Sequence, residues 1–242
     1  MKEIAIELNE ISKNFSTFEG TKTVLQKVSL CVHQGECVVL AGENGSGKSV
    51  LMSIIAGLQK KSDGKIFING KVALIFQDAD IQILGETVKE DVSVGLKNLK
   101  IKKDEQEKII ASVLQKVGLL QNMNTSTRFL SGGQKRRLAI ACMLAVNSDI
   151  FIFDEPYANL DYSGVKQVNK IIGELKNQGK TIIILTHEIE KCLAFADKFA
   201  VLHKGQIVFD GSATQALECD LEQWNIKNPL NAYKQLSDLV WR

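Results

Sequence analysis

The stretch AGENGSGKS, residues 41–49, carries only small side chains between Glu43 and Lys48 and then a single positive charge. It fits the pattern G-x-x-x-x-G-K-[ST]. The near-continuous apolar run ECVVLA before it (36–41) predicts a buried parallel strand, and the helical spacing after it ends at Gly57. Small residues let backbone N–H groups converge on an anion, and the N-terminus of the following helix adds positive character. The stretch therefore predicts a phosphate-binding loop.

In a loop of this kind the lysine reaches the β- and γ-phosphates of a nucleotide, and the serine ligates Mg²⁺. We assign these roles to Lys48 and Ser49. A glycine-rich turn without a ligand is the alternative, and the lysine and serine at these positions argue against it. The residues expected at the nucleotide are Gly42, Glu43, Asn44, Gly45, Ser46, Gly47, Lys48, Ser49 and Val50.

Two acidic residues end a second apolar run, IFIFDE (150–155). A buried strand that closes on Asp154 and Glu155 is unfavourable unless the two carboxylates have partners. We expect Asp154, at the end of the strand, to lie on the metal side of the nucleotide. We expect Glu155 to point elsewhere, where it can orient the attacking water or accept its proton. A solvated acidic turn is the alternative, and the loop at 42–49 argues against it.

The composition is that of a globular protein, with 45% hydrophobic and 24% charged residues among 242. The net charge of +2 does not indicate nucleic-acid binding, and the basic residues at 100–103 and 135–137 are expected on solvated helix faces. Five cysteines, an odd number without CxxC spacing, argue against a zinc site or disulfides. The sequence has no signal-peptide core and no apolar run of membrane length. We therefore expect a soluble chain that reaches a membrane only through a partner.

Strand-like and helix-like segments alternate along the chain, which predicts an α/β fold with a mostly parallel sheet. Besides the helix after the loop, helices are expected at 87–99, 104–120, 133–146, 163–177 and 188–196. Strands are expected at 4–8, 28–32, 36–41, 66–70, 72–76, 150–153, 181–185, 198–203 and 206–209, with 66–70 and 72–76 as a pair.

Two segments stand apart from this alternation. The helix-rich block at 82–148 is expected to be an insertion into the α/β core. The tail at 221–242 has apolar residues at helical intervals, namely Leu230, Tyr233, Leu236 and Val240. Such periodicity is common in helices that pack on their own domain, and we favour this interpretation over a helix that binds a partner.

The sequence LSGGQ, residues 130–134, opens the helical segment at 133–146. A Ser-Gly-Gly helix cap is one interpretation. A capped helix whose open N–H groups face an anion is also a γ-phosphate site, and the two interpretations are compatible. At LSGGQ the sequence resembles the ATP-binding cassette (ABC) ATPases. The resemblance implies ATP as the nucleotide, and it implies that the ATP held by the loop of a second subunit is contacted by Ser131, Gly132, Gly133 and Gln134.

Further residues match single positions of the ABC family. Gln77 resembles the glutamine that joins Mg²⁺ and water to the helical lobe, and His187 resembles the histidine that contacts the γ-phosphate. Asp161, in the segment ANLD, resembles an aspartate at the dimer seam. Phe15 resembles the aromatic residue that stacks on adenine, where the family more often has tyrosine, although the nearby Phe18 could take this place.

The resemblance covers residues 4–215 and implies the RecA-like fold of P-loop NTPases: a parallel-sheet core, an antiparallel β subdomain and an inserted α-helical signature subdomain. The whole chain, 1–242, is then a single ABC ATPase domain. Its implied parts are the core with the β subdomain at 1–81 and 149–220, the helical subdomain at 82–148 and a helical tail at 221–242. The expected catalytic residues are Glu155, His187 and Gln77, and the expected metal ligands are Ser49, Gln77 and Asp154. Three residues beside the dimer seam differ from those usual in the family, and they leave the catalytic and metal-binding residues intact: Tyr157, Asn159 and Tyr162.

The segment IFQDADIQILGETVKEDVSVGLKNLKI, residues 75–101, resembles the energy-coupling factor (ECF) and cobalt-type transporter ATPases. The shared features are a second glutamine after Gln77, then T-V-x-E-D-V and G-L-x-N-L, with Val94 in place of the usual aromatic residue. The resemblance implies that this region contacts the coupling helices of a transmembrane T component. An apolar and acidic groove beside Gln77 can pass the nucleotide state to a docked helix.

The ECF resemblance therefore implies the ATP-hydrolysing subunit of an ECF-type importer that uses ATP and Mg²⁺. The expected partners are a second ABC ATPase subunit, identical or related, a transmembrane T component and a substrate-binding membrane subunit, without nucleic acid. The expected location is the cytoplasmic face of the cell membrane. The solute, a vitamin or a transition-metal ion, is chosen by the membrane subunit and is not readable from this chain.

Three other functions are alternatives. The first is another class of ABC transporter. The second is a soluble ABC ATPase of DNA repair or translation, and the long coiled coils or second cassette that those proteins need are not present in this sequence. The third is a module that binds ATP without hydrolysing it, against which Glu155 and His187 argue.

Overall fold

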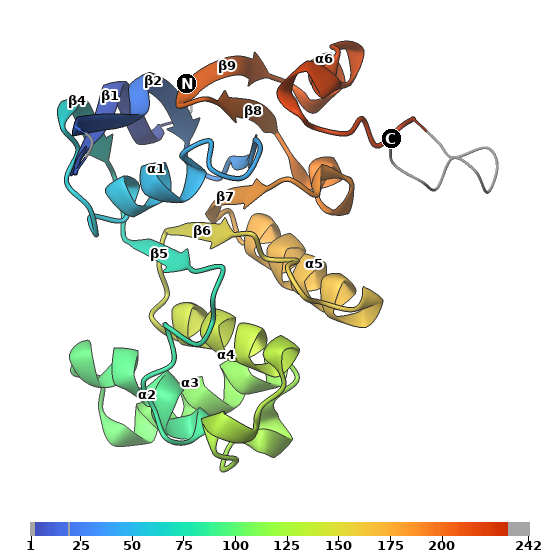
Figure 1. The fold of residues 1–242 in the computed structure, drawn as a ribbon. Coiled ribbons are helices and arrows are strands. Elements are labelled where there is room, and N and C mark those ends of the chain that lie inside the picture. Colours follow the sequence, from blue (N-terminus) through green and yellow to red (C-terminus); the bar gives the residue numbers. More distant parts are fainter. Residues whose placement is uncertain (1–2, 19, 232–242) are drawn as a thin grey trace.

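A computed structural model describes residues 3–18 and 20–231 of the chain. Figure 1 shows one lobe built around β-sheets and a second lobe made of helices. The sheet lobe holds a six-stranded sheet in the order β5-β6-β7-β3-β8-β9, in which β9 is antiparallel to β8 and all other neighbours are parallel. The predicted α/β fold with a mostly parallel sheet is confirmed. The strands are β3 (Cys37–Ala41), β5 (Val72–Ile75), β6 (Ile150–Asp154), β7 (Thr181–Thr186), β8 (Lys198–His203) and β9 (Gln206–Gly211).

The central strands of this sheet are covered on both faces. Every residue of β3, β6 and β7 is buried, as expected for near-continuous apolar runs in a parallel sheet. Alternate side chains of β3 enter different hydrophobic cores, because successive residues of a strand point to opposite faces. Val39 packs in the core that includes Ile172, and Val38 packs in the core that includes Leu51. The helices of this lobe are α1 (Lys48–Ile55), α5 (Tyr162–Asn177) and α6 (Ala213–Glu218).

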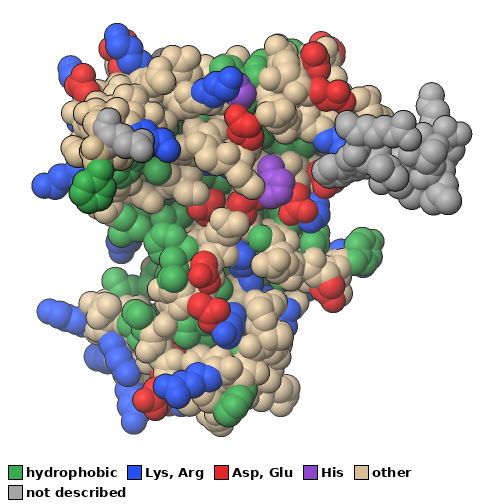
Figure 2. Space-filling view, in the orientation of Figure 1, with side chains coloured by type: hydrophobic (Ala, Val, Ile, Leu, Met, Phe, Trp, Pro, Cys, Tyr) green, Lys and Arg blue, Asp and Glu red, His purple; other side chains and the backbone are tan. Residues whose placement is uncertain are grey.

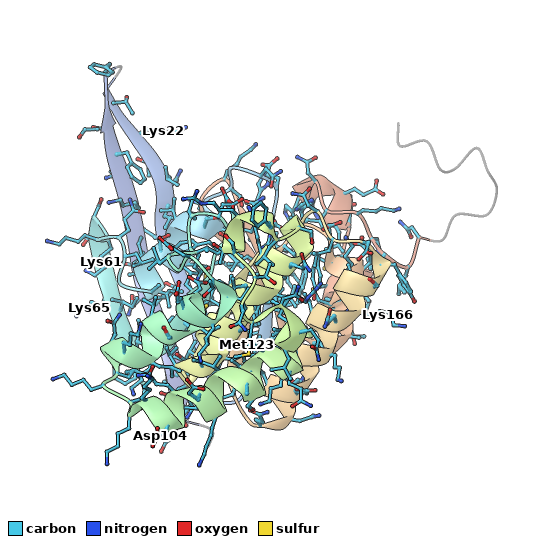
Figure 3. All side chains as sticks on the ribbon, turned by 90° about the horizontal axis from the view of Figure 1, so that it is seen from below. Lys22, Lys61, Lys65, Asp104, Met123 and Lys166 are labelled. Carbon is cyan, nitrogen blue, oxygen red and sulfur yellow. The ribbon has the colours of Figure 1, made fainter. Side chains whose placement is uncertain are left out.

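A three-stranded antiparallel sheet in the order β2-β1-β4 shares the α1-side core. Its strands are β1 (Ile4–Thr17), β2 (Gly20–His33) and β4 (Asp63–Ile68). The first two are much longer than the predicted strands at 4–8 and 28–32, because their pairing continues through several register shifts to Thr17 and Gly20. Figure 3 shows this hairpin projecting beyond the rest of the molecule, with Lys22 on its outer part.

The predicted pairing of 66–70 with 72–76 is wrong. β4 pairs with β1 in the antiparallel sheet, whereas β5 pairs with β6 in the parallel sheet. Gly70 lies between them with φ +130°, a backbone conformation that glycine adopts readily. The chain therefore leaves one sheet and enters the other at this turn, although the two apolar runs are close neighbours in the sequence.

The second lobe contains α2 (Val88–Asn98), α3 (Lys103–Lys116) and α4 (Gly132–Ala145), with short 3₁₀ turns at Leu120–Asn122 and Thr127–Phe129. Thr87 begins α2 with a capping box to Glu90. The helix predicted at 104–120 ends at Lys116, shortly before Gly118, which has φ +68°. Figure 1 shows these helices packed together beneath β5 and β6. Within the described part of the chain, every helix is too short or too polar to span a membrane.

The helix predicted at 188–196 is wrong. The structure has two 3₁₀ turns there, Ile189–Lys191 and Leu193–Phe195, separated by Cys192 with φ −142°. The apolar residues Ile189 and Leu193 are both buried, and their spacing of four imitates a helical face. Burial against the sheet therefore produced the periodicity without a continuous helix.

The start of the C-terminal tail packs on the sheet lobe. Leu221–Trp224 forms a 3₁₀ turn, and the Trp224 ring lies 6.1 Å from that of Phe209 in β9. Leu230 is exposed. The predicted tail helix depends on residues that lie outside the described part of the chain: Tyr233, Leu236 and Val240.

Candidate nucleotide-binding and hydrolysis site

The loop at 42–49 joins β3 to α1 and is confined by two neighbouring strands. Gly42 has φ +154°, and a Cβ there would collide with the carbonyl oxygen of Leu202 in β8. Gly47 has φ +106°, and a Cβ there would lie 2.8 Å from Leu25 Cδ2 in β2. Both positions therefore require glycine. Local packing demands the same small residues that a bound phosphate would need.

Lys48 is the buried cation of this loop, with a side chain that is 6% exposed. Its Nζ donates hydrogen bonds to the carbonyl oxygens of Gly42 (2.7 Å) and Glu43 (3.0 Å), and it lies 3.9 Å from Glu155 Oε1. Burial lowers the pKa of Lys48, and the carboxylates of Glu155 and Asp154 oppose this shift. An ammonium group has three donors, so the third can serve a phosphate oxygen.

Asp154 ends β6 beside the first turn of α1. Its Oδ1 is buried and has no hydrogen-bond partner among residues 3–18 and 20–231. Burial raises the pKa of Asp154, whereas a hydrogen bond from Ser49 lowers it. In the loop, Ser46 Oγ is likewise buried without a partner in the described part of the chain. Buried polar atoms normally have hydrogen-bond partners. The Asp154 carboxylate and the Ser49 hydroxyl beside it are suitable oxygen ligands for a hard divalent cation.

Glu155 is turned away from Asp154 by its backbone, which has φ +45°. Its N–H donates to the carbonyl oxygen of Leu185 (2.9 Å), and its Oε1 lies 3.0 Å from His187 Nδ1. His187 follows β7, the parallel neighbour of β6, so the ends of two adjacent strands bring these side chains together. The two carboxylates thus have different partners, Ser49 for Asp154 and His187 for Glu155, and the roles expected of them stay predictions.

Gln77 follows β5 and lies where two cavities meet. A cavity of about 360 Å³ is lined by residues of the phosphate loop, by Gln77 and by Glu155. A second cavity, of about 620 Å³, lies between the sheet lobe and the start of α4 and includes Gln77 and Gly132 in its lining. Ser49, Gln77 and Asp154 line both cavities. Figure 2 shows that the molecular surface is hollowed between the two lobes.

Ser131 and Gln134 begin α4 with reciprocal hydrogen bonds. Ser131 Oγ accepts a bond from Gln134 N (3.3 Å), and Gln134 Oε1 accepts one from Ser131 N (2.8 Å). This capping box confirms the interpretation of LSGGQ as a helix cap. Ser131 and Gly132 are exposed, so a second molecule can reach them. Their contact with the ATP of a second subunit stays a prediction.

Two further predicted residues lie apart from the cavities. Phe15 is on β1, where Lys13 Nζ lies 4.8 Å from the centre of its ring. Asp161 caps α5 by accepting hydrogen bonds from Gly164 N (2.7 Å) and Ser163 Oγ (3.0 Å), and these bonds lower the pKa of Asp161. Neither residue lines either cavity, so their contacts with nucleotide stay predictions.

Sequence reasoning missed two residues that touch this site. The expected solvated face at 135–137 is wrong for Arg136, which is 5% exposed and donates hydrogen bonds to the carbonyl oxygens of Phe76 and Glu155. The missed Asn225, in the tail, donates a hydrogen bond of 2.9 Å to the Glu43 carboxylate in the phosphate loop. Neither Arg136, in a run of polar residues, nor Asn225, far along the chain, belongs to a periodic sequence pattern. Only the folded structure reveals their contacts.

A family model described as "ABC transporter" matches residues 25–158. This match spans the phosphate loop, the LSGGQ sequence and the acidic pair at 154–155. The chain belongs to the ABC transporter family. It is an ABC ATPase, an enzyme that binds and hydrolyses ATP.

The ABC ATPase is 38% identical over 227 residues to "Energy-coupling factor transporter ATP-binding protein EcfA1" of Mycoplasma mobile, a match that covers 88% of this chain and 82% of that relative. It is also 38% identical over 209 residues to EcfA of Methanocaldococcus jannaschii, covering 80% of this chain and 75% of the relative. These similarities agree with the predicted resemblance to ECF transporter ATPases.

Solved structures of ABC cassettes share the fold. One is cbiO1 from Clostridium perfringens, described as part of the ABC transporter complex cbiONQ, with a TM-score of 0.79 and 30% identity over 94% of this chain and 97% of that chain. Another is the dimeric cassette MJ0796 in a post-hydrolysis state bound to ADP and Pi, with a TM-score of 0.80 and 26% identity over 86% of this chain and 98% of that chain.

Proposed function

We propose that this ABC ATPase is the energy-coupling subunit of an ECF-type importer, which takes up a vitamin or a transition-metal ion through membrane partners. The resemblance to ECF ATP-binding proteins supports the transporter type. A membrane partner is supported by three exposed apolar side chains, of which two line the Gln77 cavity or the cavity next to it. They are Ile81 (66% exposed), Leu84 (75%) and Phe129 (84%).

Ile81 and Leu84 line two cavities that share Asp80 and Lys135, and Phe129 follows Arg128, which lines the second of these cavities. Ile81 lines the 620 Å³ cavity, and Leu84 lines a neighbouring cavity together with Thr127. Thr127, two residues before Phe129, donates from its backbone N–H to the Glu86 carbonyl oxygen (3.0 Å) and from its hydroxyl to that of Gly85 (2.9 Å). Exposed apolar groups that gather beside a hollow are typical of a protein–protein interface. The apolar region fits a helix of a membrane-embedded partner.

Asp91 holds part of this region in place. The residue is 4% exposed, and its Oδ1 accepts hydrogen bonds from Leu84 N (2.7 Å) and Gly85 N (2.8 Å). A buried carboxylate that accepts two backbone bonds fixes the loop strongly. Leu84 is therefore presented on a rigid segment, which suits a surface that passes force between the ATPase and a docked helix.

In the proposed reaction, the phosphate chain of ATP lies along the loop at 42–49, where Lys48 offsets the charge of the β- and γ-phosphates. Glu155 accepts a proton from the attacking water as the water oxygen bonds to the γ-phosphorus and the bond to the ADP oxygen breaks. His187 holds the Glu155 carboxylate from one side and contacts the γ-phosphate from the other. Phe15 stacks on adenine, and Asp161 lies at the dimer seam.

The donor set at Ser49 and Asp154, with Gln77 beside it, fits Mg²⁺. Within the described part of the chain, no cluster of three or more His, Cys, Asp or Glu side chains could hold a metal ion alone, which agrees with an ion that shares phosphate oxygens. Ser49 and Asp154 would hold this ion, and it would supply positive charge to the phosphate chain. Gln77 lies beside these two residues and also lines the 620 Å³ cavity.

The proposed assembly contains two ABC ATPase subunits, of which this chain is one, a transmembrane T component and a substrate-binding membrane subunit. Ser131 to Gln134 of each ATPase contact the ATP in the loop of the other. ATP binding closes the pair and pulls on the membrane partner, and hydrolysis resets it. This places the chain at the cytoplasmic face of the membrane, without nucleic acid as a partner.

The assembly is tested by affinity purification of the tagged chain from detergent-solubilised native membranes, with mass spectrometry of its companions. The proposal predicts a T-type membrane protein, a small membrane-embedded binding subunit and an ABC ATPase. Uptake of labelled vitamins and transition-metal ions by vesicles that contain the complex then identifies the solute. Recovery of the chain with ribosomes or DNA, and without membrane proteins, would contradict the proposal.

The docking region is tested with a matched pair of double variants. Ile81→Ser with Leu84→Ser is predicted to abolish co-purification of the T component while ATP binding by the isolated chain is retained. Leu58→Ser with Phe67→Ser removes two other exposed apolar side chains (64% and 52% exposed) and should leave the complex intact. Equal recovery of the T component with both pairs of variants would show that the docking site lies elsewhere on the chain.

A further inference from the structure

Arg136, near the start of α4, reaches from the helical lobe into the sheet lobe. Its side chain donates hydrogen bonds through Nη1 to the carbonyl oxygens of Phe76 (3.3 Å) and Glu155 (3.2 Å), and through Nη2 to that of Gln77. Three carbonyl oxygens from two separate segments thus meet one guanidinium group. The planar guanidinium holds its donors in a fixed fork that spans the two segments, whereas the donors of a lysine ammonium all lie on one atom at the end of a flexible chain.

The surroundings of Arg136 keep it charged although it is buried. Burial lowers its pKa, and the carboxylates of Asp154, Asp78 and Glu155 oppose this effect. The site therefore holds a buried positive charge beside the residues proposed to handle ATP. A side chain that served only to fill space would be apolar, because buried charges are unfavourable unless they are paired.

The bond to Glu155 acts on a strained residue. Glu155 has φ +45°, which a residue with a Cβ rarely adopts. Its N–H donates to Leu185 O (2.9 Å), and its carbonyl oxygen accepts hydrogen bonds from Arg136 Nη1 (3.2 Å) and from Ala158 N (3.2 Å). Both peptide groups around Glu155 are therefore fixed, and this backbone conformation directs the carboxylate to His187.

The hydrogen bonds from Arg136 to Phe76 and Gln77 attach α4 to the segment that leads to the proposed docking region. A second link strengthens this attachment, because Lys135 Nζ lies 2.6 Å from Asp80 Oδ1. The start of α4 is thus joined to residues 76–80 on one side and to Glu155 on the other. Arg136 therefore directly links the docking segment and α4 to the backbone of Glu155.

We propose that Arg136 is a positioning residue that joins the Gln77 segment and the start of α4 to Glu155 of the same chain, an inference that rests on the proposed catalytic role of Glu155. When the helical lobe is correctly placed, Arg136 holds the Glu155 backbone in the conformation that aims its carboxylate. When α4 moves away, the Glu155 carbonyl loses the Arg136 donor and keeps only the Ala158 N–H, so the strained conformation is held less firmly. The helical lobe thereby controls hydrolysis within its own subunit, in addition to any contact across a dimer.

The first test compares Arg136→Gln, Arg136→Lys and the control Arg128→Gln in the full chain. Arg128 is an exposed arginine of the same lobe, so its variant removes the same charge without touching the Glu155 network. Arg136→Gln is expected to lower kcat by about 100-fold, since a displacement of about 1 Å at a catalytic group can have that effect. Arg136→Lys should recover part of this loss, while the KM for ATP and the affinity for a fluorescent ATP analogue stay near wild type in all three. Unchanged kcat in a folded Arg136→Gln protein would overturn the inference.

The second test is a double-mutant cycle between Arg136→Gln and Glu155→Gln, measured by single-turnover ATP cleavage. If Arg136 acts through Glu155, its replacement should change the rate of the Glu155→Gln protein by less than about twofold. If the rate reductions of the two single variants multiply in the double variant, Arg136 acts independently of Glu155, and the inference would be overturned. If Arg136→Gln does not fold, the same cycle with Arg136→Lys decides.

The two tests separate this inference from the function on which it rests. Wild-type turnover of the Glu155→Gln protein would contradict the proposed role of Glu155. Slow turnover of Glu155→Gln combined with normal turnover of both Arg136 variants would leave that role standing and overturn the positioning role of Arg136 alone.

Discussion

The imidazole of His187 lies against the carboxylate of Glu155, with Nδ1 3.0 Å from Oε1. The His187 side chain is 48% exposed, whereas that of Glu155 is 6% exposed. Lys48 Nζ lies 3.9 Å from the same carboxylate oxygen. The buried acid is thus flanked by a buried cation and by a histidine that remains open to solvent and ligand. This arrangement suits an acid that must hold one orientation while a neighbouring group senses the phosphate.

Replacement of His187 by alanine should slow hydrolysis more than it weakens ATP binding. Without the imidazole, the Glu155 carboxylate loses its hydrogen-bond partner, and we expect kcat to fall by about 100-fold because the carboxylate is no longer aimed. Steady-state ATPase assays give kcat and KM, and titration with an ATP analogue gives the affinity. His33→Ala is the matched control, since His33 lies near Glu36, away from both cavities, and should retain wild-type kcat. A loss of affinity without a loss of kcat in His187→Ala would contradict this interpretation.

Alanine at Gly42 and at Gly132 should have opposite effects on the stability of the fold. A Cβ at Gly42 would collide with the Leu202 carbonyl at φ +154°, so Gly42→Ala should lower the free energy of unfolding by more than about 1 kcal/mol. At Gly132, in the first turn of α4, no atom of the described residues lies within 4 Å of a Cβ. Gly132→Ala should therefore unfold at the wild-type temperature or higher. Thermal unfolding without nucleotide measures both, and equal destabilisation would argue against the tight loop packing.

The cysteines should differ in their reactivity toward an alkylating reagent. Burial raises the pKa of the Cys37 thiol to about 12, and it also raises the pKa values of Cys142 and Cys192. These thiols bind their proton more tightly in the folded state, so at pH 8 they should remain thiols and resist iodoacetamide. Cys219, which is only partly buried, should react before these three cysteines. Mass spectrometry of the native and urea-unfolded chain measures each site, and rapid native labelling of Cys37 or Cys192 would contradict the packing of the core.

The residues around the phosphate loop were predictable because local patterns determine them. The runs that became β3, β6 and β7 are wholly apolar, which indicates buried parallel strands, and such strands place their ends at one edge of a sheet. The loop, Asp154, Glu155 and His187 all follow such strand ends. Their proximity therefore follows from the predicted topology.

Features that depend on tertiary packing were not predictable in the same way. Ile189 and Leu193 are buried against the sheet at a spacing that imitates a helix, so the 3₁₀ turns around Cys192 went unrecognised. The burial of Arg136 depends on carbonyl oxygens about 60 residues away in the chain, as the Gln77 bond shows. The bond from Asn225 to Glu43 spans 182 residues. No short sequence pattern encodes contacts of this kind.

The variant Glu155→Gln is the decisive test of ATP hydrolysis by this chain, because it removes the proposed proton acceptor and keeps the shape of the side chain. The measurement is the rate of ATP cleavage, together with the molar mass of the chain in ATP and in ADP by light scattering. We expect an ATP affinity near wild type, a turnover lowered by at least about 100-fold, and a dimer that persists in ATP but not in ADP. Turnover at the wild-type rate would show that Glu155 is not the proton acceptor.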